Sequence, residues 1–159
     1  MEATRRSGHP RTHENGLQGR PLADYDRASA THDQLDTELV LIRGLPGSGK
    51  STMARVLAMV GYEHFEADQY FMRDGVYHFD GARVREAHAW CQRSTRQALQ
   101  KGKRTVVSNT FTQLREMEPY MAMSRNVHVI EATGQWRNVH DVPPETLKRM
   151  AERWEPLHA

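Results

Sequence analysis

One short run of residues combines the side-chain types and spacing needed to hold a polyphosphate. Residues 44–51 fit the P-loop pattern Gly-x-x-x-x-Gly-Lys-Ser/Thr. Its glycines let successive backbone N–H groups turn inward onto phosphate oxygens, and the next helix adds the positive end of its dipole. Lys50 would reach the β- and γ-phosphates, and the Ser51 hydroxyl would hold Mg²⁺. The residues expected to bind a nucleoside triphosphate are Gly44, Leu45, Pro46, Gly47, Ser48, Gly49, Lys50, Ser51 and Thr52.

The flanking sequence places this loop between a strand and a helix. Residues 39–42 are apolar and branched, which is typical of a buried parallel strand. Residues 51–60 have apolar side chains at helical spacing, and Gly61 stands where a helix would end. This context is the one that the phosphate-binding pattern requires.

Strands and helices continue to alternate after the loop. Short runs predict strands over 64–67, 105–108 and 127–130. Helical spacing predicts a long helix over 82–101 with one apolar face, formed by Val84, Ala87, Cys91, Thr95 and Ala98. A shorter helix with Leu114, Met117 and Met121 on one side should follow, and then a last helix opened by Pro143 and Pro144 with a buried stripe of Leu147, Met150, Ala151 and Trp154. The alternation predicts an α/β fold, a three-layer parallel sheet of about four or five strands.

Composition limits the other possibilities. We expect one domain over residues 38–156, preceded by a disordered leader over 1–37 that has few large apolar side chains; an upstream start-site artefact, with the protein beginning near Leu35, is the alternative. Cys91 is the only cysteine, so no internal disulfide can form. No apolar run approaches membrane-spanning length, and a cytoplasmic location is expected. The nine histidines show no recognised metal-ligand spacing.

The rest of the chain limits the classes of reaction that the P-loop could serve. The guanine-reading string Asn-Lys-x-Asp of GTPases is absent, and the predicted strand over 105–108 ends without the carboxylate that motor-type ATPases show. A small phosphotransferase remains, which needs a base for the attacking hydroxyl and a cation for the transferring group.

Asp68 is the best candidate for the base, because it follows the carboxyl end of a predicted parallel strand. Its alternative role is to cap the turn that begins at Gln69. Arg137 is the best candidate for the cation, in a loop that could close as a lid over the triphosphate; a plain surface arginine is its alternative. Asp74 and Asp80 stand next to glycines, where forming turns is the expected role.

Five ordered segments resemble one family, the polynucleotide-kinase-like P-loop kinases of the zeta-toxin and adenylate-kinase type. The segments are the P-loop, Glu66-Ala67-Asp68-Gln69-Tyr70-Phe71, Tyr77-His78-Phe79-Asp80, Val107-Ser108-Asn109-Thr110-Phe111-Thr112 and Trp136-Arg137-Asn138-Val139-His140-Asp141-Val142-Pro143. The domain in certain ubiquitin-ligase-binding proteins is closer still in the third and fifth. The resemblance covers about residues 38–154. It implies an adenylate-kinase-like architecture with a short lid.

The resemblance also implies an activity, which is ATP-dependent phosphorylation of a hydroxyl, often a nucleic-acid 5′ end. By position Lys50 and Ser51 match the family's phosphate and metal residues, Asp68 its activating carboxylate and Arg137 its lid arginine. Two departures matter. Family members often have a carboxylate at the position of Ser108 or Asn109, which leaves a second metal ligand open here, and the phage enzyme has an arginine where this chain has Phe71.

The acceptor stays open at this level. Basic residues along and after the long helix could face a phosphate backbone or simply solvent, and they are Arg83, Arg85, Arg93, Arg96, Lys101, Lys103 and Arg104. Trp136 and Tyr70 could stack on a base or pack inside the fold. Three hypotheses follow: a polynucleotide 5′-hydroxyl kinase, a small-molecule kinase, and a nucleotide-bound adaptor with little turnover. The preference for ATP over GTP, the oligomeric state and protein partners are not determined by the sequence.

Overall fold

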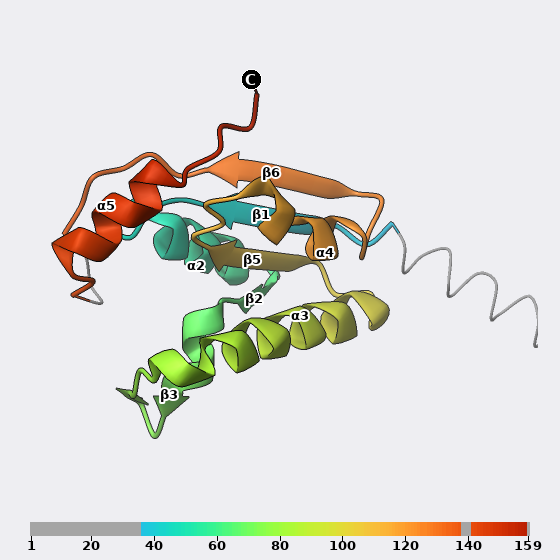
Figure 1. The fold of residues 1–159 in the computed structure, drawn as a ribbon. Coiled ribbons are helices and arrows are strands. Elements are labelled where there is room, and N and C mark those ends of the chain that lie inside the picture. Colours follow the sequence, from blue (N-terminus) through green and yellow to red (C-terminus); the bar gives the residue numbers. More distant parts are fainter. Residues whose placement is uncertain (1–35, 138–140, 159) are drawn as a thin grey trace, which may run out of the picture.

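A computed structural model describes residues 36–137 and 141–158. Apart from residues 36 and 37, the predicted leader lies outside the described residues, as do three residues of the predicted lid. The fold is built on a four-stranded parallel sheet (Figure 1). Its strands, in spatial order, are β2 (Glu63–Phe65), β5 (Thr105–Asn109), β1 (Leu39–Arg43) and β6 (Val127–Glu131). Every residue of β1 and β5 is buried, as expected for parallel strands covered on both faces.

Alternate residues of the strands pack against different helices, which gives the three predicted layers. On one face the sheet meets α3 (Val84–Gln100) and the short α4 (Glu118–Met121), and on the other α2 (Lys50–Met59). The first interface buries Leu39, Leu41, Cys91, Leu99, Val107 and Tyr120. The second buries Val40, Ile42, Ala54 and Val106. The predicted α/β fold with a parallel sheet is therefore confirmed.

Smaller elements gather at the carboxyl ends of the strands. The 3-10 helix η1 (Ala67–Phe71) follows β2 and leads into a hairpin of β3 (Met72–Arg73) and β4 (Val76–Tyr77). Asp74 and Gly75 form its turn with φ of 49° and 76°, the positive values that a tight hairpin turn needs. Asp80 caps η2 (Gly81–Arg83) by accepting a hydrogen bond from the Ala82 N–H at 2.9 Å. The predicted turn roles of Asp74 and Asp80 are confirmed.

Two predicted helices differ from the structure. The segment around Met117 forms only η3 (Leu114–Glu116) and α4, with Pro119 in the first turn of α4, and Met121 is exposed rather than packed. The last helix, α5 (Pro144–Glu152), has no fully buried residue, and Ala151 is exposed. The physical reason is position, because α5 lies beyond the carboxyl ends of the strands and does not cover a face of the sheet (Figure 1). None of the helices in the described part of the chain combines the length and the hydropathy that a membrane span requires.

Candidate active site

The loop between β1 and α2 has the backbone that the P-loop pattern predicts. Gly47 and Gly49 have φ of 82° and 89°, values that favour glycine. Gly44 is needed for a different reason. A Cβ there would overlap the Ser48 hydroxyl and lie 2.9 Å from the carbonyl oxygen of Ala132. Gly49 is also the N-cap of α2, and no side chain caps that end. The N-terminal end of α2 is therefore open to an anion.

The segment after β6 holds the P-loop in place. The Gly134 N–H donates to the carbonyl oxygen of Ser48 at 3.1 Å, and the Trp136 N–H donates to that of Gly47 at 2.8 Å. The Trp136 indole packs over Gly49 and Gly134 so closely that a Cβ at either glycine would overlap it. Trp136 is nevertheless 70% exposed, and it lines a cavity of about 620 Å³ together with Ser48, Gly49, Thr52 and Thr133.

A larger cavity of about 910 Å³ lies at the carboxyl ends of the strands and includes Lys50, Glu66 and Asp68. Its walls come from elements far apart in the sequence: η1, the hairpin, the start of α3, the segment after β5, and α5. Burial lowers the pKa of the Lys50 amine, and the nearby carboxylates of Glu66 and Asp68 act in the opposite direction. The cavity thus brings the P-loop lysine and Asp68 to one space.

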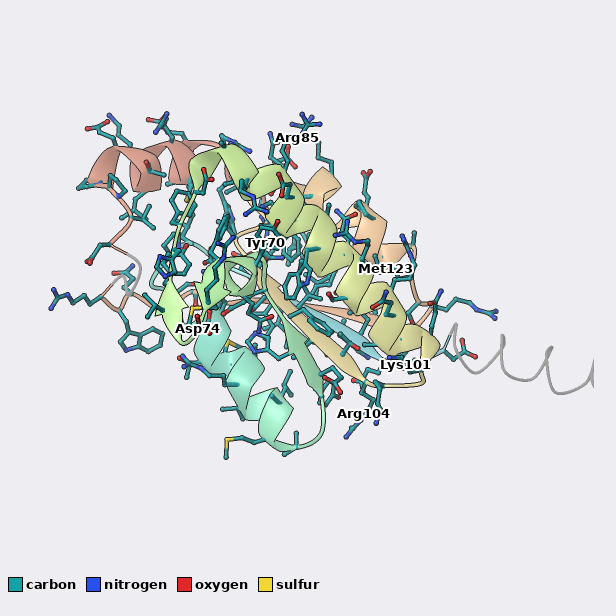
Figure 2. The ribbon with its side chains drawn as sticks, turned by 90° about the horizontal axis from the view of Figure 1, so that it is seen from below. Tyr70, Asp74, Arg85, Lys101, Arg104 and Met123 are labelled. Carbon is teal, nitrogen blue, oxygen red and sulfur yellow. The ribbon has the colours of Figure 1, made fainter. Side chains whose placement is uncertain are left out.

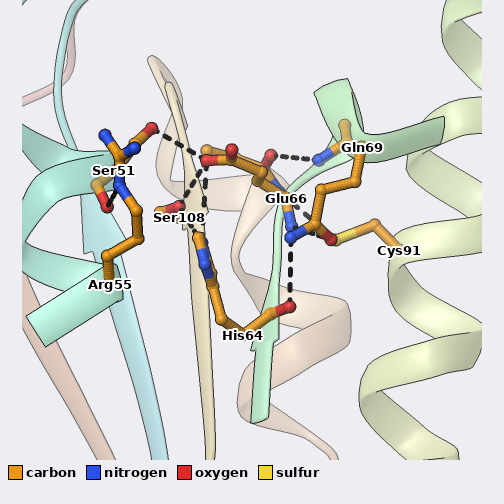
Figure 3. A network of polar contacts seen from close by, with 9 residues as sticks. Ser51, Arg55, His64, Glu66, Gln69, Cys91 and Ser108 are labelled. Atoms are coloured by element: carbon orange, nitrogen blue, oxygen red, sulfur yellow. Dashed lines mark hydrogen bonds and ion pairs between the residues drawn. The ribbon is translucent and has the colours of Figure 1, made fainter. Parts of the chain in front are cut away.

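Glu66 is the centre of a polar network (Figure 3). Its Oε2 atom accepts hydrogen bonds from the hydroxyls of Ser51 and Ser108, both at 2.8 Å. The Nε2 atom of His64 lies 2.9 Å from the Ser108 hydroxyl and 3.6 Å from the same carboxylate oxygen. Burial alone would raise the pKa of Glu66, but hydrogen bonds from His64, Ser108 and Ser51 outweigh it and lower the pKa to about 2. A carboxylate therefore lies against the hydroxyl predicted to hold Mg²⁺.

Asp68 does not cap the turn that follows it. The 3-10 helix begins one residue earlier, at Ala67, and its N-cap is Glu66, whose backbone N–H donates to Gln69 Oε1 at 3.2 Å. The Asp68 side chain instead accepts a hydrogen bond from the Tyr77 hydroxyl at 3.2 Å and faces the larger cavity. Among the hydrogen bonds of the described residues, none gives Asp68 the alternative capping role.

Arg137 stands apart from these groups. It is exposed on the segment that follows Trp136, and the described residues that line the two cavities do not include it. Besides Lys50, the larger cavity is lined by the basic residue Arg153, which follows α5. The Arg153 guanidinium lies 3.5 Å from the Glu116 carboxylate. Sequence reasoning gave Arg153 no role.

The basic residues of the long helix do not form a groove at this site. Arg85 lies near one end of α3, whereas Lys101 and Arg104 lie at the other (Figure 2). The Arg83 guanidinium forms an ion pair with Glu86 at 2.8 Å and donates a hydrogen bond to the Tyr70 hydroxyl. The described residues that line the larger cavity include none of the seven basic residues considered above.

Glu66 and Tyr77 also line the larger cavity, and sequence reasoning assigns neither a role. The predicted strand over 64–67 includes Glu66, whereas β2 ends at Phe65 and leaves Glu66 at its carboxyl end, and Tyr77 belongs to a two-residue strand that has no periodic signal. The available signal for Glu66 was indirect. The neighbouring strand ends at Ser108 and Asn109 without a carboxylate, so an acidic group at the end of another strand was the residue to seek.

The sheet order β2-β5-β1-β6, with the P-loop between the central strand β1 and α2, defines a P-loop kinase-like domain. The chain belongs to the family AAA_33, described as "AAA domain", whose model matches residues 39–153. It is 37% identical over 133 residues to NEDD4-binding protein 2 of Homo sapiens, an alignment that covers 74% of this chain and 8% of that protein. The chain therefore spans only a small part of the length of this relative.

Solved structures of other proteins share the fold. The Pnkp1/Rnl/Hen1 complex matches with a TM-score of 0.51 and 18% identity, over 78% of this chain and 41% of that chain. A gluconokinase from Sinorhizobium meliloti 1021 matches with a TM-score of 0.56 and 16% identity, over 77% of this chain and 78% of that chain. At these identities the likeness describes architecture and does not select an acceptor.

Proposed function

We propose that the domain over residues 38–156 is an ATP-dependent phosphotransferase that moves the γ-phosphate to a hydroxyl acceptor, and that this acceptor is a polynucleotide 5′-hydroxyl. One observation supports this most directly. Lys50 of the P-loop and the carboxylate of Asp68 face the same cavity, at the carboxyl edge of a parallel sheet. The phosphate tail and the acceptor hydroxyl need such an arrangement in order to meet.

Each residue has a distinct task in this proposal. The P-loop amides and Lys50 bind the phosphates. Asp68 accepts the proton of the acceptor hydroxyl as its oxygen bonds to the γ-phosphorus and the bond to the β-phosphate oxygen breaks, which releases ADP. Arg137, on the segment before α5, would neutralise the transferring group when that segment closes. The Ser51 hydroxyl would hold Mg²⁺, and the bound ion would supply further neutralisation of the phosphates.

The metal requirement agrees with the residues present. Among residues 36–137 and 141–158, no group of three or more His, Cys, Asp or Glu side chains could hold a metal ion by itself. Ser51 and the adjacent carboxylate of Glu66 offer oxygen atoms only. Mg²⁺ prefers oxygen ligands and often takes most of them from phosphates and water, so this donor set fits a magnesium–nucleotide complex.

Aromatic side chains in the larger cavity support a nucleoside at the accepting end. The ring centroids of Phe71 and Phe79 are 5.3 Å apart, and the rings of Tyr77 and Phe79 are stacked within 20°. Phe79 is 61% exposed. A base of the terminal nucleotide can stack on such a surface, whereas a small polyol would leave it uncovered.

The test uses ATP labelled at the γ-phosphate. DNA and RNA oligonucleotides with a 5′-hydroxyl are compared with the same oligonucleotides bearing a 5′-phosphate, and with a panel of gluconate, nucleosides and other small hydroxyl compounds. We expect label on the 5′-hydroxyl ends alone. The Lys50→Ala variant should lose ~10²-fold or more of this rate, as expected when a stabiliser of developing charge is removed.

Other outcomes select other functions. Label on a small compound but on neither DNA nor RNA would make this a small-molecule kinase. ATP binding without ADP release for any acceptor would support a nucleotide-bound adaptor, and the phosphotransferase proposal would then be wrong.

A further inference from the structure

We propose that Glu66 is the acidic residue of the magnesium site, in place of a carboxylate at the end of β5. This inference rests on the proposed phosphotransferase function, because it concerns how that site holds its metal. Its basis is the contact between α2 and the end of β2, where the Ser51 hydroxyl donates a 2.8 Å hydrogen bond to Oε2 of Glu66. β5 itself ends with the uncharged residues Ser108 and Asn109.

The direction of this hydrogen bond suits metal binding. A serine hydroxyl has one proton and two lone pairs, and a carboxylate can only accept. By donating its proton to Glu66, Ser51 keeps its lone pairs available for a cation. The negative charge of Glu66 lies next to that position and would attract Mg²⁺ there, either directly or through a bound water.

Two further residues hold the Glu66 carboxylate in place. Ser108 donates to the same Oε2 atom at 2.8 Å. Because the Ser108 proton is used in this bond, the 2.9 Å contact between Ser108 Oγ and His64 Nε2 requires the proton to lie on Nε2. Ser108 and His64 are therefore positioning residues, and they fix the orientation of the carboxylate relative to Ser51.

The charge of Glu66 gives the proposal a distinctive signature. Without metal, a carboxylate beside Lys50 repels the triphosphate and weakens the attraction of the lysine for it. With Mg²⁺, the same carboxylate favours the complex. Removing the charge should therefore change metal-free and metal-dependent nucleotide binding in opposite directions, whereas a purely structural residue would weaken both.

The experiment is calorimetry with a non-hydrolysable ATP analogue, in excess Mg²⁺ and in excess chelator. In the wild-type chain we expect Mg²⁺ to tighten binding. Glu66→Gln should lose ~10-fold or more of this magnesium effect, the usual cost of removing a group that orients a metal ligand, and should bind the metal-free analogue at least as tightly as wild type. Glu63→Gln makes the same change at an exposed position of β2 and should match wild type in both conditions.

A rescue variant tests the geometry independently. Glu66→Ser combined with Ser108→Asp exchanges the two partners across their 2.8 Å contact and returns a carboxylate to the neighbourhood of Ser51. We expect it to recover most of the magnesium effect. This variant also decides the question if Glu66→Gln fails to fold.

The outcomes separate the two proposals. If wild type binds the analogue with a magnesium effect that Glu66→Gln retains in full, the role of Glu66 is wrong and the phosphotransferase proposal stands. If Glu66→Gln weakens binding of the analogue equally in Mg²⁺ and in chelator, and the exchanged variant does not recover the magnesium effect, Glu66 is a structural residue. That result would also overturn its proposed role in metal binding. If wild type binds no nucleotide in either condition, both proposals are wrong.

Discussion

The Tyr77 hydroxyl donates a hydrogen bond to Oδ1 of Asp68 across 3.2 Å, from a hairpin strand to the 3-10 helix that precedes it. Tyr77 is itself held among aromatic rings, with the centroid of Phe71 at 6.2 Å and that of Phe79 at 6.4 Å. The hairpin therefore orients the carboxylate that we propose as the base. Its two short strands have a function beyond closing the fold.

Replacing Tyr77 by Phe should slow phosphate transfer without changing ATP binding. The ring and its packing remain, but the carboxylate loses a donor that holds it toward the acceptor. Hydrogen bonds to charged groups contribute about 1.5–3 kcal/mol, and water can replace part of this, so we expect kcat to fall about tenfold. Steady-state kinetics checks this, with Tyr70→Phe as a matched control, because the Tyr70 hydroxyl contacts Glu86 away from the cavity. Equal losses in both variants would contradict the orienting role.

The same tyrosine predicts a loss of stability at high pH. Burial, together with the adjacent Asp68 carboxylate, raises the pKa of Tyr77 to about 12. A folded-state pKa above the unfolded value of about 10 means that the contribution is complete below pH 10 and is lost as the pH rises toward 12. Urea unfolding between pH 9 and 12 should therefore show the free energy of unfolding falling more steeply in wild type than in Tyr77→Phe. Parallel curves for the two proteins would show that Tyr77 titrates normally.

Asp68→Asn should separate catalysis from folding. Asparagine keeps the size of the side chain and an oxygen that can accept from Tyr77, but it cannot take up the acceptor proton. Because the turn is capped at Glu66 rather than at Asp68, the free energy of unfolding should change by less than about 1 kcal/mol. Phosphate transfer should fall ~10²–10⁴-fold with ATP affinity unchanged. If the variant unfolds instead, Asp68 is a structural residue and the assignment of the base is wrong.

The parts of the site that could be predicted from the sequence are those whose functional residues are adjacent in the sequence. The P-loop places all its groups within residues 44–52, directly after a continuous apolar run over residues 39–42 that is typical of a buried parallel strand. The fold class could be predicted from the alternation of strands and helices along the chain. Asp68 could be proposed because it follows the end of a strand, a rule that needs no knowledge of strand order.

Assigning a role to Glu66 requires knowledge of the strand order in the sheet. Ser51 and Glu66 are 15 residues apart, and Glu66 and Ser108 are 42 apart. They meet because β2 pairs with β5, so the ends of these two strands become neighbours. Hydrophobic pattern predicts that strands exist but not which strand pairs with which. The sequence shows that Ser108 is not a carboxylate. Only the fold shows that Glu66, at the end of the adjacent strand β2, lies next to it.

Gly44→Ala should disrupt the P-loop although Gly44 does not have a positive φ. The added Cβ would overlap the Ser48 hydroxyl and approach the Ala132 carbonyl oxygen to 2.9 Å, and backbone cannot move aside cheaply. Nucleotide affinity should fall about tenfold or more, and overpacking typically costs about 1–3 kcal/mol of stability. Gly81→Ala is the matched control, since its nearest contact would be the Phe79 ring at 3.7 Å. A Gly44→Ala protein with wild-type affinity would show that the loop has more room than this structure gives it.

Arg43 links the end of β1 to the C-terminal segment. Its side chain is completely buried, lies 3.9 Å from the centre of the Trp154 ring and donates to the carbonyl oxygen of Thr112 at 3.3 Å. Glu131 is 3.8 Å away, and the Nε and Nη1 atoms make no hydrogen bond within the described residues. Burial lowers the pKa of Arg43, while Glu131 and two further glutamates act in the opposite direction. The guanidinium is thus a poorly satisfied buried charge whose packing matters.

We therefore expect Arg43→Met to be tolerated better than Arg43→Ala. Alanine leaves a cavity beneath Trp154 and should cost about 3 kcal/mol in the free energy of unfolding. Methionine fills much of the volume, keeps a favourable sulfur–aromatic contact and removes the cost of burying a charge, so its loss should be smaller by at least about 1 kcal/mol. Urea unfolding measures both, and Arg55→Met, the same replacement on the exposed side of α2, should stay within about 0.5 kcal/mol of wild type. If Arg43→Met were as unstable as Arg43→Ala, the charge of Arg43 rather than its volume would hold the C-terminal segment to the sheet.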